Sequence, residues 1–219
     1  MIKALIFDLD GTLADTESMH HLAWEQTLLN NGVTQFSLET FMNYVGTSNE
    51  KVAEDYIESN NIKKSSAELI REKQDLFMDL IPEIKLLPGV REIIVRCHTT
   101  FRLAVASSSH LKEILFLLQS QKLNSYFDLV IGGDMVTRKK PDPEIYLKTQ
   151  QTLDVSPWEC IAFEDSEHGL NSAKNAGMYG VAIPNKFTMN HNFSRADMIL
   201  TSLTEMNDER INTLLQHAP

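Results

Sequence analysis

Residues 2–13 read IKALIFDLDGTL, and the interpretation of the whole chain starts from this stretch. The apolar run Ala4–Phe7 predicts a buried parallel strand that ends where Asp8 and Asp10 follow. Ligands of open α/β sheets bind at the carboxyl ends of the strands, and side chains two residues apart in extended backbone point the same way. We therefore expect Asp8 and Asp10 to converge on one cation or phosphate, with Gly11 turning the chain away. The alternative is that Asp-Gly forms only a turn here.

The composition limits the classes of protein to which the chain can belong. It has 219 residues, 42% of them hydrophobic, and a formal net charge of -10 at pH 7. This length permits a sizeable core, while the acidic balance argues against nucleic acid or an anionic membrane as the partner. No stretch approaches the roughly 18 to 20 apolar residues that span a bilayer. Cys97 and Cys160 lack metal-type spacing, so we expect reduced thiols in a soluble cytoplasmic protein.

Alternating patterns along the chain predict an α/β core with parallel strands and helices on both faces. Between Asp15 and Lys85, however, consecutive helical patterns follow one another with no strand pattern between them. A parallel crossover normally needs one helix, so residues 15–85 are interpreted as an inserted helical-bundle cap domain and residues 1–14 and 86–219 as the core domain. The alternative is that these helices pack on the sheet. Helices are expected at residues 17–31, 38–44, 49–60, 66–81, 90–97, 111–119, 144–153 and 168–176. After the first strand, further strands are expected at residues 103–106, 129–131, 160–163, 179–183 and 198–200.

Hydroxyl groups follow the second predicted strand, because Ser107, Ser108 and Ser109 come directly before a predicted helix. Hydroxyls and backbone N–H groups at a helix N-terminus form an anion site. The Ser107 hydroxyl and the Ser108 N–H are therefore placed to hold phosphoryl oxygens. Ordinary N-capping of the helix by Ser109 is the alternative.

A lysine follows the third predicted strand, in the sequence Arg138-Lys139-Lys140-Pro141. Lys139 is interpreted as a solvated surface residue. Lys140 differs because the residue before a proline is restricted to extended backbone and is aimed reproducibly. Its compact positive charge suits a phosphate and a neighbouring carboxylate, so Lys140 is a candidate for the site.

Two adjacent acids, Glu164 and Asp165, end the fourth predicted strand. Magnesium prefers oxygen ligands and keeps several waters, so acids directly after an apolar strand are candidate metal ligands. The competing interpretation, strongest for Asp165, is compensation of the dipole at a helix N-terminus.

The four strand ends together resemble the motifs of the haloacid dehalogenase-like (HAD) superfamily. Asp8-Leu9-Asp10-Gly11-Thr12 is similar to its first motif, and the serine, Lys-Pro and Glu-Asp segments match the other three in order. The resemblance covers essentially the whole chain and is nearest to the β-phosphoglucomutase-like and sugar-phosphate phosphatase branch. It implies a Rossmann-like parallel sheet with an inserted helical cap.

This resemblance implies phosphoryl transfer through an aspartyl intermediate on Asp8, with Asp10 as the acid and base. Lys140 and Ser107 complete an electrostatic cradle for the phosphoryl group. The expected cofactor is Mg²⁺, and the expected partner is a small phosphorylated metabolite as the substrate. The protein itself is expected to be a monomer or weak homodimer. Residues assigned to catalysis are Asp8, Asp10, Ser107 and Lys140, and those assigned to the metal are Asp8, Asp10 through its carbonyl, Asp165 and, in support, Glu164.

Substrate choice is expected to lie in the cap, because the sheet supplies generic phosphate chemistry. By resemblance, the mutase branch carries an arginine near the place of Asn49 that grips a second phosphate. A neutral amide cannot replace a bidentate guanidinium, which favours a phosphatase. Expected substrate-binding residues are Thr16, Glu17, His20, Gly46, Thr47, Asn49 and Lys73, with Ser107, Ser108 and Lys140.

The favoured function is therefore Mg²⁺-dependent hydrolysis of a small phosphomonoester, with a sugar phosphate as the expected substrate. A β-phosphoglucomutase-like phosphohexomutase is the second hypothesis. A non-catalytic binding or regulatory relative is the third, and it is disfavoured because none of the expected acids is missing. A haloacid dehalogenase is disfavoured too, since the resembled dehalogenases lack an aspartate at the place of Asp10.

Overall fold

The structure is a computed structural model that describes residues 1–45 and 47–211. It divides into two compact units. The sheet unit comprises Met1–Asp15 and the described residues from Lys85 onward, and the helical unit comprises Thr16–Ile84. That the helical unit serves as a cap stays a prediction. Among the described helices, none combines the length and the apolar character required to cross a membrane.

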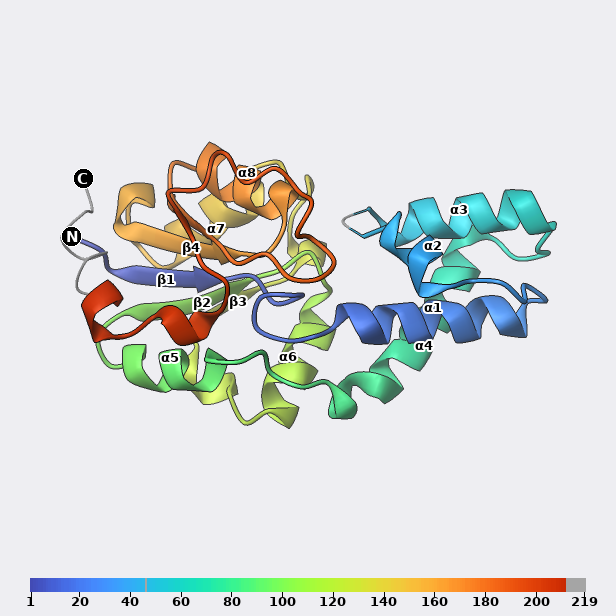
Figure 1. Cartoon of the computed structure of the whole chain (residues 1–219), viewed down its shortest axis with the longest axis horizontal. Coiled ribbons are helices and arrows are strands. Elements are labelled where there is room, and N and C mark those ends of the chain that lie inside the picture. The colour runs from blue at the N-terminus through green and yellow to red at the C-terminus, as the bar shows by residue number, and fades with distance from the viewer. Residues whose placement is uncertain (46, 212–219) are drawn as a thin grey trace. The chain divides into compact units, whose positions relative to one another are not determined.

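The sheet unit is built on six parallel strands within the described residues, in the order β3-β2-β1-β4-β5-β6 (Figure 1). Each expected strand is present with bounds that differ by at most one residue. The strands are β1 (Ala4–Phe7), β2 (Arg102–Ala106), β3 (Leu129–Ile131), β4 (Cys160–Glu164), β5 (Tyr179–Ala182) and β6 (Met198–Ile199).

Helices cover both faces of this sheet, as expected for parallel strands joined by crossovers. Figure 1 shows α5 and α6 on one face and α7 and α8 on the other. The predicted α/β fold class with a Rossmann-like parallel sheet is thereby confirmed. The helices are α5 (Val90–Cys97), α6 (Leu111–Ser120), α7 (Glu144–Thr152) and α8 (Glu167–Asn175), with short 3₁₀ turns at Asn124–Tyr126, Gly133–Met135, Pro157–Glu159 and Leu203–Glu205.

The central strand β1 is buried on both faces, which explains its continuous apolar sequence. Side chains alternate along a strand. Ile6 packs into a core cluster with Ile145 and Tyr146 of α7, whereas Phe7 stacks on Phe163 of β4 with ring centroids 4.7 Å apart. In the register, Phe7 pairs with both Val105 and Phe163, so the residues that follow β1, β2 and β4 meet at one edge of the sheet.

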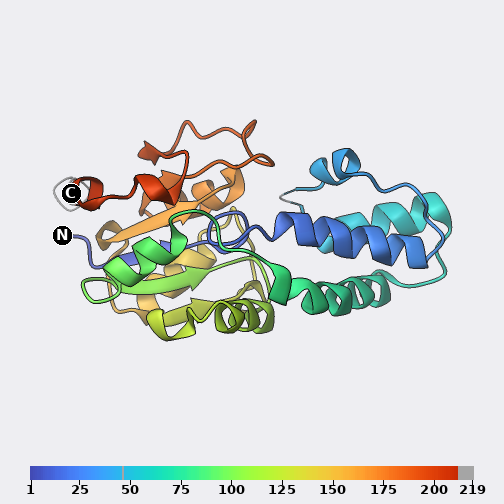
Figure 2. The ribbon, with the colours of Figure 1, turned by 60° about the horizontal axis from the view of Figure 1, so that its bottom comes forward.

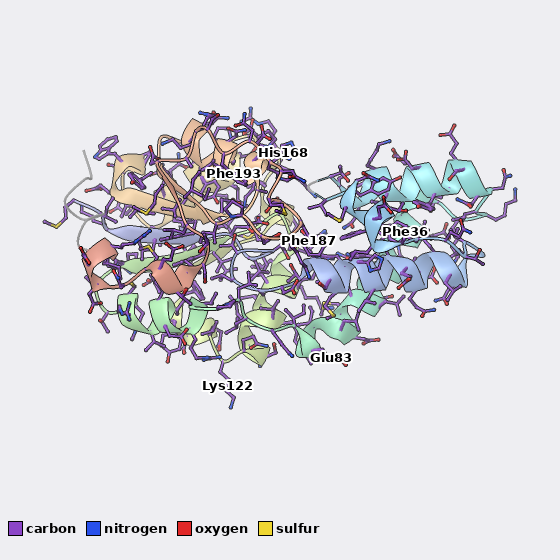
Figure 3. All side chains as sticks on the ribbon, in the orientation of Figure 1. Phe36, Glu83, Lys122, His168, Phe187 and Phe193 are labelled. Carbon is purple, nitrogen blue, oxygen red and sulfur yellow. The ribbon has the colours of Figure 1, made fainter. Side chains whose placement is uncertain are left out.

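The helical unit has its own apolar core, which gathers Trp24, Leu28, Phe36, Phe41 and Leu69 (Phe36 is labelled in Figure 3). The longest two helices, α1 and α4, run side by side (Figure 2). The elements are α1 (Glu17–Asn30), α2 (Leu38–Met42), α3 (Asn49–Asn60), α4 (Ser66–Leu80) and a 3₁₀ turn at Ile81–Glu83.

Local capping chemistry sets the bounds of these helices. Ser48 caps α3 by accepting the Lys51 N–H, and Ser65 forms a capping box with Glu68 at the start of α4. The helix α1 ends at Asn30, and Gly32 follows with a φ of 87°, in the left-handed region that favours glycine.

Candidate active site

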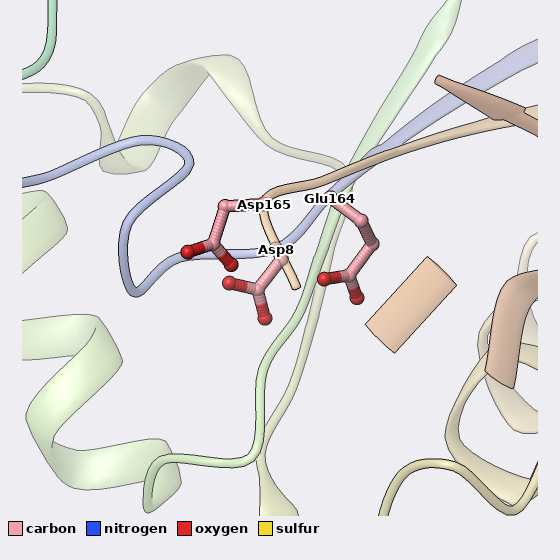
Figure 4. Close-up of side chains that lie close together, drawn as sticks. All are labelled: Asp8, Glu164 and Asp165. Atoms are coloured by element: carbon pink, nitrogen blue, oxygen red, sulfur yellow. The ribbon is translucent and has the colours of Figure 1, made fainter. Parts of the chain in front are cut away.

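Three buried carboxyl groups meet at the edge of the sheet where the strands end. Asp8 follows β1, Glu164 is the last residue of β4, and Asp165 comes next. One oxygen from each of them lies within 4.8 Å of the others. Figure 4 shows the three carboxyl groups side by side. The expected convergence of the first and fourth strand ends is therefore present in the structure.

A buried lysine lies against this acidic cluster. The Lys140 ammonium group donates to Asp8 Oδ1 and to Glu164 Oε1, both at 2.6 Å, and to the Ala106 carbonyl at 2.8 Å. These three bonds use all three donors of an ammonium group. Lys140 thus joins the ends of β1, β2 and β4, whereas Lys139 is exposed, as predicted.

Burial and neighbouring charges shift the pKa of Asp8 and of Lys140. Burial raises the pKa of Asp8 well above its usual range, opposed by the Lys140 ammonium and reinforced by the charges of Glu164 and Asp10. For Lys140, burial lowers the pKa, but the attraction of Asp8 and Glu164 outweighs it and the net pKa is raised. The Lys140 ammonium contacts two of the three acids, so a bound cation would add positive charge beside Asp8 and favour its ionised form.

The donor set fits a hard divalent cation. Magnesium binds carboxylate and carbonyl oxygens, and these three residues offer only such atoms. In addition, Glu164 Oε2 is buried and has no hydrogen-bond partner among the described residues. A buried oxygen without a partner is costly, and a metal ion would satisfy it. Asp10 was also predicted to contribute, through its carbonyl, and that contribution stays a prediction.

The Asp10 carboxylate is held by two serine hydroxyls. Ser107 Oγ donates to Asp10 Oδ2 at 2.9 Å, and Ser109 Oγ donates to the same oxygen at 2.7 Å. Ser107 Oγ also accepts the Ser109 N–H at 3.0 Å. The alternative reading of Ser109 as an ordinary N-cap is wrong, because α6 begins one residue later with His110 at the N-cap. Ser108, the expected backbone donor, is exposed.

Two polar side chains near the cluster were not predicted from the sequence. The Tyr146 hydroxyl donates to Glu164 Oε1, and the Asn185 amide donates to Asp165 Oδ2 at 2.7 Å. Tyr146 lies on the buried face of α7, where its sequence position indicates only a core aromatic. Asn185 lies in an irregular loop after β5, and no local pattern points from that loop to Asp165.

The model of a known family matches this chain over residues 5–183, and its description is "haloacid dehalogenase-like hydrolase". The chain belongs to this family. Protein CbbY of Rhodobacter capsulatus is 35% identical over 214 residues, which cover 93% of this chain and 94% of CbbY. Fructose-1-phosphate phosphatase YqaB of Escherichia coli (strain K12) is 33% identical over 180 residues, which cover 82% and 95%.

A solved structure extends the likeness to the fold of the whole chain. The crystal structure of a mutant CbbY from Rhodobacter sphaeroides in complex with xylulose-(1,5)bisphosphate has a TM-score of 0.86 and 32% sequence identity. The match covers 94% of this chain and 97% of that chain. Membership of the haloacid dehalogenase-like family, inferred from the four motifs, is thereby confirmed.

In this haloacid dehalogenase-like hydrolase, two expected substrate contacts of the helical unit lie together. The Lys73 ammonium lies 2.7 Å from His20 Nδ1 and 4.7 Å from the ring centroid of Phe77, and the His20 ring stacks on Phe77. Lys73 is fully buried, which sequence periodicity did not predict. Their role toward a substrate stays a prediction.

Two of the remaining expected contacts of the helical unit, Asn49 and Thr47, have hydrogen-bond partners within that unit. Asn49 Oδ1 accepts the Trp24 indole N–H at 3.2 Å, and Thr47 Oγ1 donates to the Tyr44 carbonyl at 2.7 Å. Thr16 is buried at the N-cap position of α1, and Glu17 is its first residue. Gly46 lies outside the described residues.

The two cysteines of this hydrolase contribute no nucleophile. Cys97 and Cys160 are free and buried. Burial raises the pKa of Cys97 to about 11 and that of Cys160 to about 12, so neither forms a thiolate near neutral pH.

A glycine in α8 leaves room for the Glu164 carboxyl group. A Cβ atom at Gly169 would overlap the Glu164 carboxylate. On helix propensity alone, Gly169→Ala would stabilise the helix by about 1 kcal/mol. We expect the opposite sign, because displacing a buried carboxylate costs about 1 to 3 kcal/mol, and we expect the affinity for Mg²⁺ to fall as well. Thermal unfolding and Mg²⁺ titration test this, with the exposed His168→Ala on the same helix as control. A rise in stability with unchanged Mg²⁺ affinity would contradict it.

Proposed function

We propose that this chain is a Mg²⁺-dependent phosphatase that hydrolyses a small sugar phosphate through an aspartyl-phosphate intermediate on Asp8. The observation that carries this proposal is the buried cluster of Asp8, Glu164 and Asp165 with Lys140 bonded to two of the three. Relatives within this family that are named as phosphatases support an enzyme that hydrolyses phosphate esters. The named activity of YqaB and the bisphosphate bound to CbbY support a phosphorylated sugar as the substrate.

The chain's own residues carry two displacement steps at phosphorus. In the first, an Asp8 carboxylate oxygen attacks phosphorus in line, the P–O bond to the sugar breaks, and Asp10 gives its proton to the leaving oxygen. In the second, water attacks the phosphorus of the aspartyl phosphate and gives a proton to Asp10. The bond between phosphorus and Asp8 then breaks and inorganic phosphate leaves. Asp10 therefore ends each cycle as it began.

Electrostatics favour this assignment of roles. Lys140 fixes one oxygen of Asp8 by a direct bond, so the carboxylate has a defined orientation. The hydroxyls of Ser107 and Ser109 both donate to Asp10 Oδ2, and these two hydrogen bonds fix the orientation of the Asp10 carboxyl group. Asp8, Glu164 and Asp165, with the Asp10 carbonyl, would hold Mg²⁺, which when bound neutralises charge on the phosphoryl oxygens. Such preorganised charge is the main contribution of protein groups to phosphoryl transfer.

The phosphatase and mutase hypotheses differ in the fate of the phosphoryl group. Asn49 supports hydrolysis, because its amide is neutral and its oxygen already accepts the Trp24 N–H. A second phosphate would therefore lack a cationic partner at this position.

A phosphate-release screen tests the proposal. Sugar mono- and bisphosphates, phosphoglycolate and nucleotides are each supplied with Mg²⁺ or with EDTA. We expect release from at least one sugar phosphate, loss of release in EDTA and recovery when Mg²⁺ is restored. Turnover that persists in EDTA would overturn the metal requirement. Formation of glucose 6-phosphate from β-glucose 1-phosphate and a bisphosphate primer, faster than phosphate release, would make the chain a mutase.

A further inference from the structure

The loop after β5 reaches the acidic cluster through one side chain, Asn185. Its Nδ2 group donates to Asp165 Oδ2 at 2.7 Å and to the Gly11 carbonyl oxygen at 3.2 Å. The two acceptors lie on different segments, since Gly11 follows Asp10 in the loop after β1 and Asp165 follows β4. One amide group therefore bridges the loop that carries Asp10 and a carboxylate of the cluster.

The loop itself fixes the orientation of this amide. Asn185 Oδ1 accepts the Phe187 N–H at 2.8 Å, so the NH₂ group is the one that faces Asp165. The Asn185 N–H donates to Thr188 Oγ1 at 3.1 Å, and its carbonyl accepts the Thr188 N–H at 3.1 Å. Thr188 and Phe187, the latter labelled in Figure 3, are both buried. The contacts within the turn thus hold the amide in place independently of its hydrogen bond to Asp165.

The bridge also depends on the absence of a side chain at Gly11. Gly11 has a φ of 78°, and a Cβ atom there would lie 2.6 Å from Asn185 Nδ2 and would overlap the Asp165 carboxylate. Only glycine allows the carboxylate, the amide and the turn to occupy this space. Gly11 therefore has two roles. It reverses the chain after Asp10, and its lack of a side chain leaves space for the Asp165 carboxylate and the Asn185 amide.

We infer that Asn185 is a positioning residue that orients Asp165 for the divalent cation and ties it to the loop after β1. This inference rests on the proposed function, because it takes Asp165 as a metal ligand. An amide suits the task, since it donates a hydrogen bond to the carboxylate without adding a positive charge that would compete with the cation. A lysine or arginine at this position would neutralise part of the cluster.

The variant Asn185→Ser tests the bridge apart from the turn. A serine hydroxyl still accepts the N–H two residues on, as in an ST turn, but it is too short to keep the contacts with Asp165 and Gly11. Removing a hydrogen-bond partner of a metal ligand typically weakens metal affinity by about 10- to 100-fold, and we expect a loss in this range. Calorimetric titration with Mg²⁺ in the absence of substrate measures it. Partial recovery of kcat at saturating Mg²⁺ is expected in a phosphate-release assay.

The control is Asn190→Ala, an exposed asparagine of the same segment, whose Mg²⁺ affinity should stay within about twofold of the wild-type value. Thermal unfolding in EDTA identifies any variant that fails to fold, and Asn185→Thr, whose hydroxyl can also accept the Phe187 N–H and adds no charge, then replaces the serine variant. A folded variant with wild-type Mg²⁺ affinity would overturn only the inference about Asn185 and would leave the proposed function standing. A wild-type protein that neither binds Mg²⁺ nor releases phosphate would instead overturn the proposed function.

Discussion

Asp8→Asn is expected to lower phosphate release by at least about 10⁴-fold, the scale seen when a covalent nucleophile is removed. The asparagine has nearly the shape of the aspartate, and its oxygen still accepts a hydrogen bond from Lys140, so the site keeps its geometry. The neutral amide, however, cannot form the aspartyl phosphate and contributes less to binding a cation. Initial rates with the best substrate of the screen, at saturating Mg²⁺, measure the effect.

Loss of activity in this variant should not come from unfolding. Because the folded-state pKa of Asp8 is raised, ionised Asp8 destabilises the metal-free protein at neutral pH. Asp8→Asn should therefore unfold in EDTA at the same or a higher temperature than the wild type, and the difference should shrink as the pH falls toward about 4, the usual pKa of aspartate. Asp154→Asn is the matched control, since Asp154 is exposed with a φ of 56° that asparagine tolerates. Undiminished turnover in Asp8→Asn would exclude covalent catalysis by this residue.

The sequence predicted those parts of the site that local rules determine. Asp8, Glu164 and Asp165 each follow directly on an apolar strand, and parallel strands end at the same edge, so their convergence follows from the strand pattern alone. Lys140 carried a further signal, its place before Pro141. The N-caps Ser48 and Ser65 of the helical unit are also locally determined, because capping involves residues three apart.

The contacts that the sequence did not predict join residues far apart in the chain. Asn185 and Gly11 are separated by 174 residues, and Tyr146 and Glu164 by 18. In a helical pattern, a tyrosine on the apolar face indicates packing, and nothing local shows that its hydroxyl meets a carboxylate. The run of three serines was ambiguous for another reason. All three can cap a helix, and the start of α6 one residue later decided the matter.

The second large effect is expected for Lys140→Met, which keeps the length of the side chain and removes its charge. All three ammonium donors are used, so the variant leaves Asp8, Glu164 and the Ala106 carbonyl without their donor. Loss of one preorganised charge that stabilises a transition state costs about 10²- to 10³-fold in kcat. Breaking a buried ion pair by removing one partner costs about 3 to 5 kcal/mol, which lowers the unfolding temperature by on the order of 10 °C.

Mg²⁺ distinguishes these two consequences of Lys140→Met. A cation bound to the cluster supplies positive charge where the ammonium was, so Mg²⁺ should raise the unfolding temperature of the variant more than that of the wild type. The rate should stay low at any Mg²⁺ concentration, because the cation does not replace the hydrogen bond that aims Asp8. Unfolding scans with and without Mg²⁺, and kcat at saturating Mg²⁺, test both parts against Lys139→Met at the exposed neighbouring position. Wild-type kcat together with an unchanged unfolding temperature would show that Lys140 neither orients Asp8 nor balances the cluster's charge.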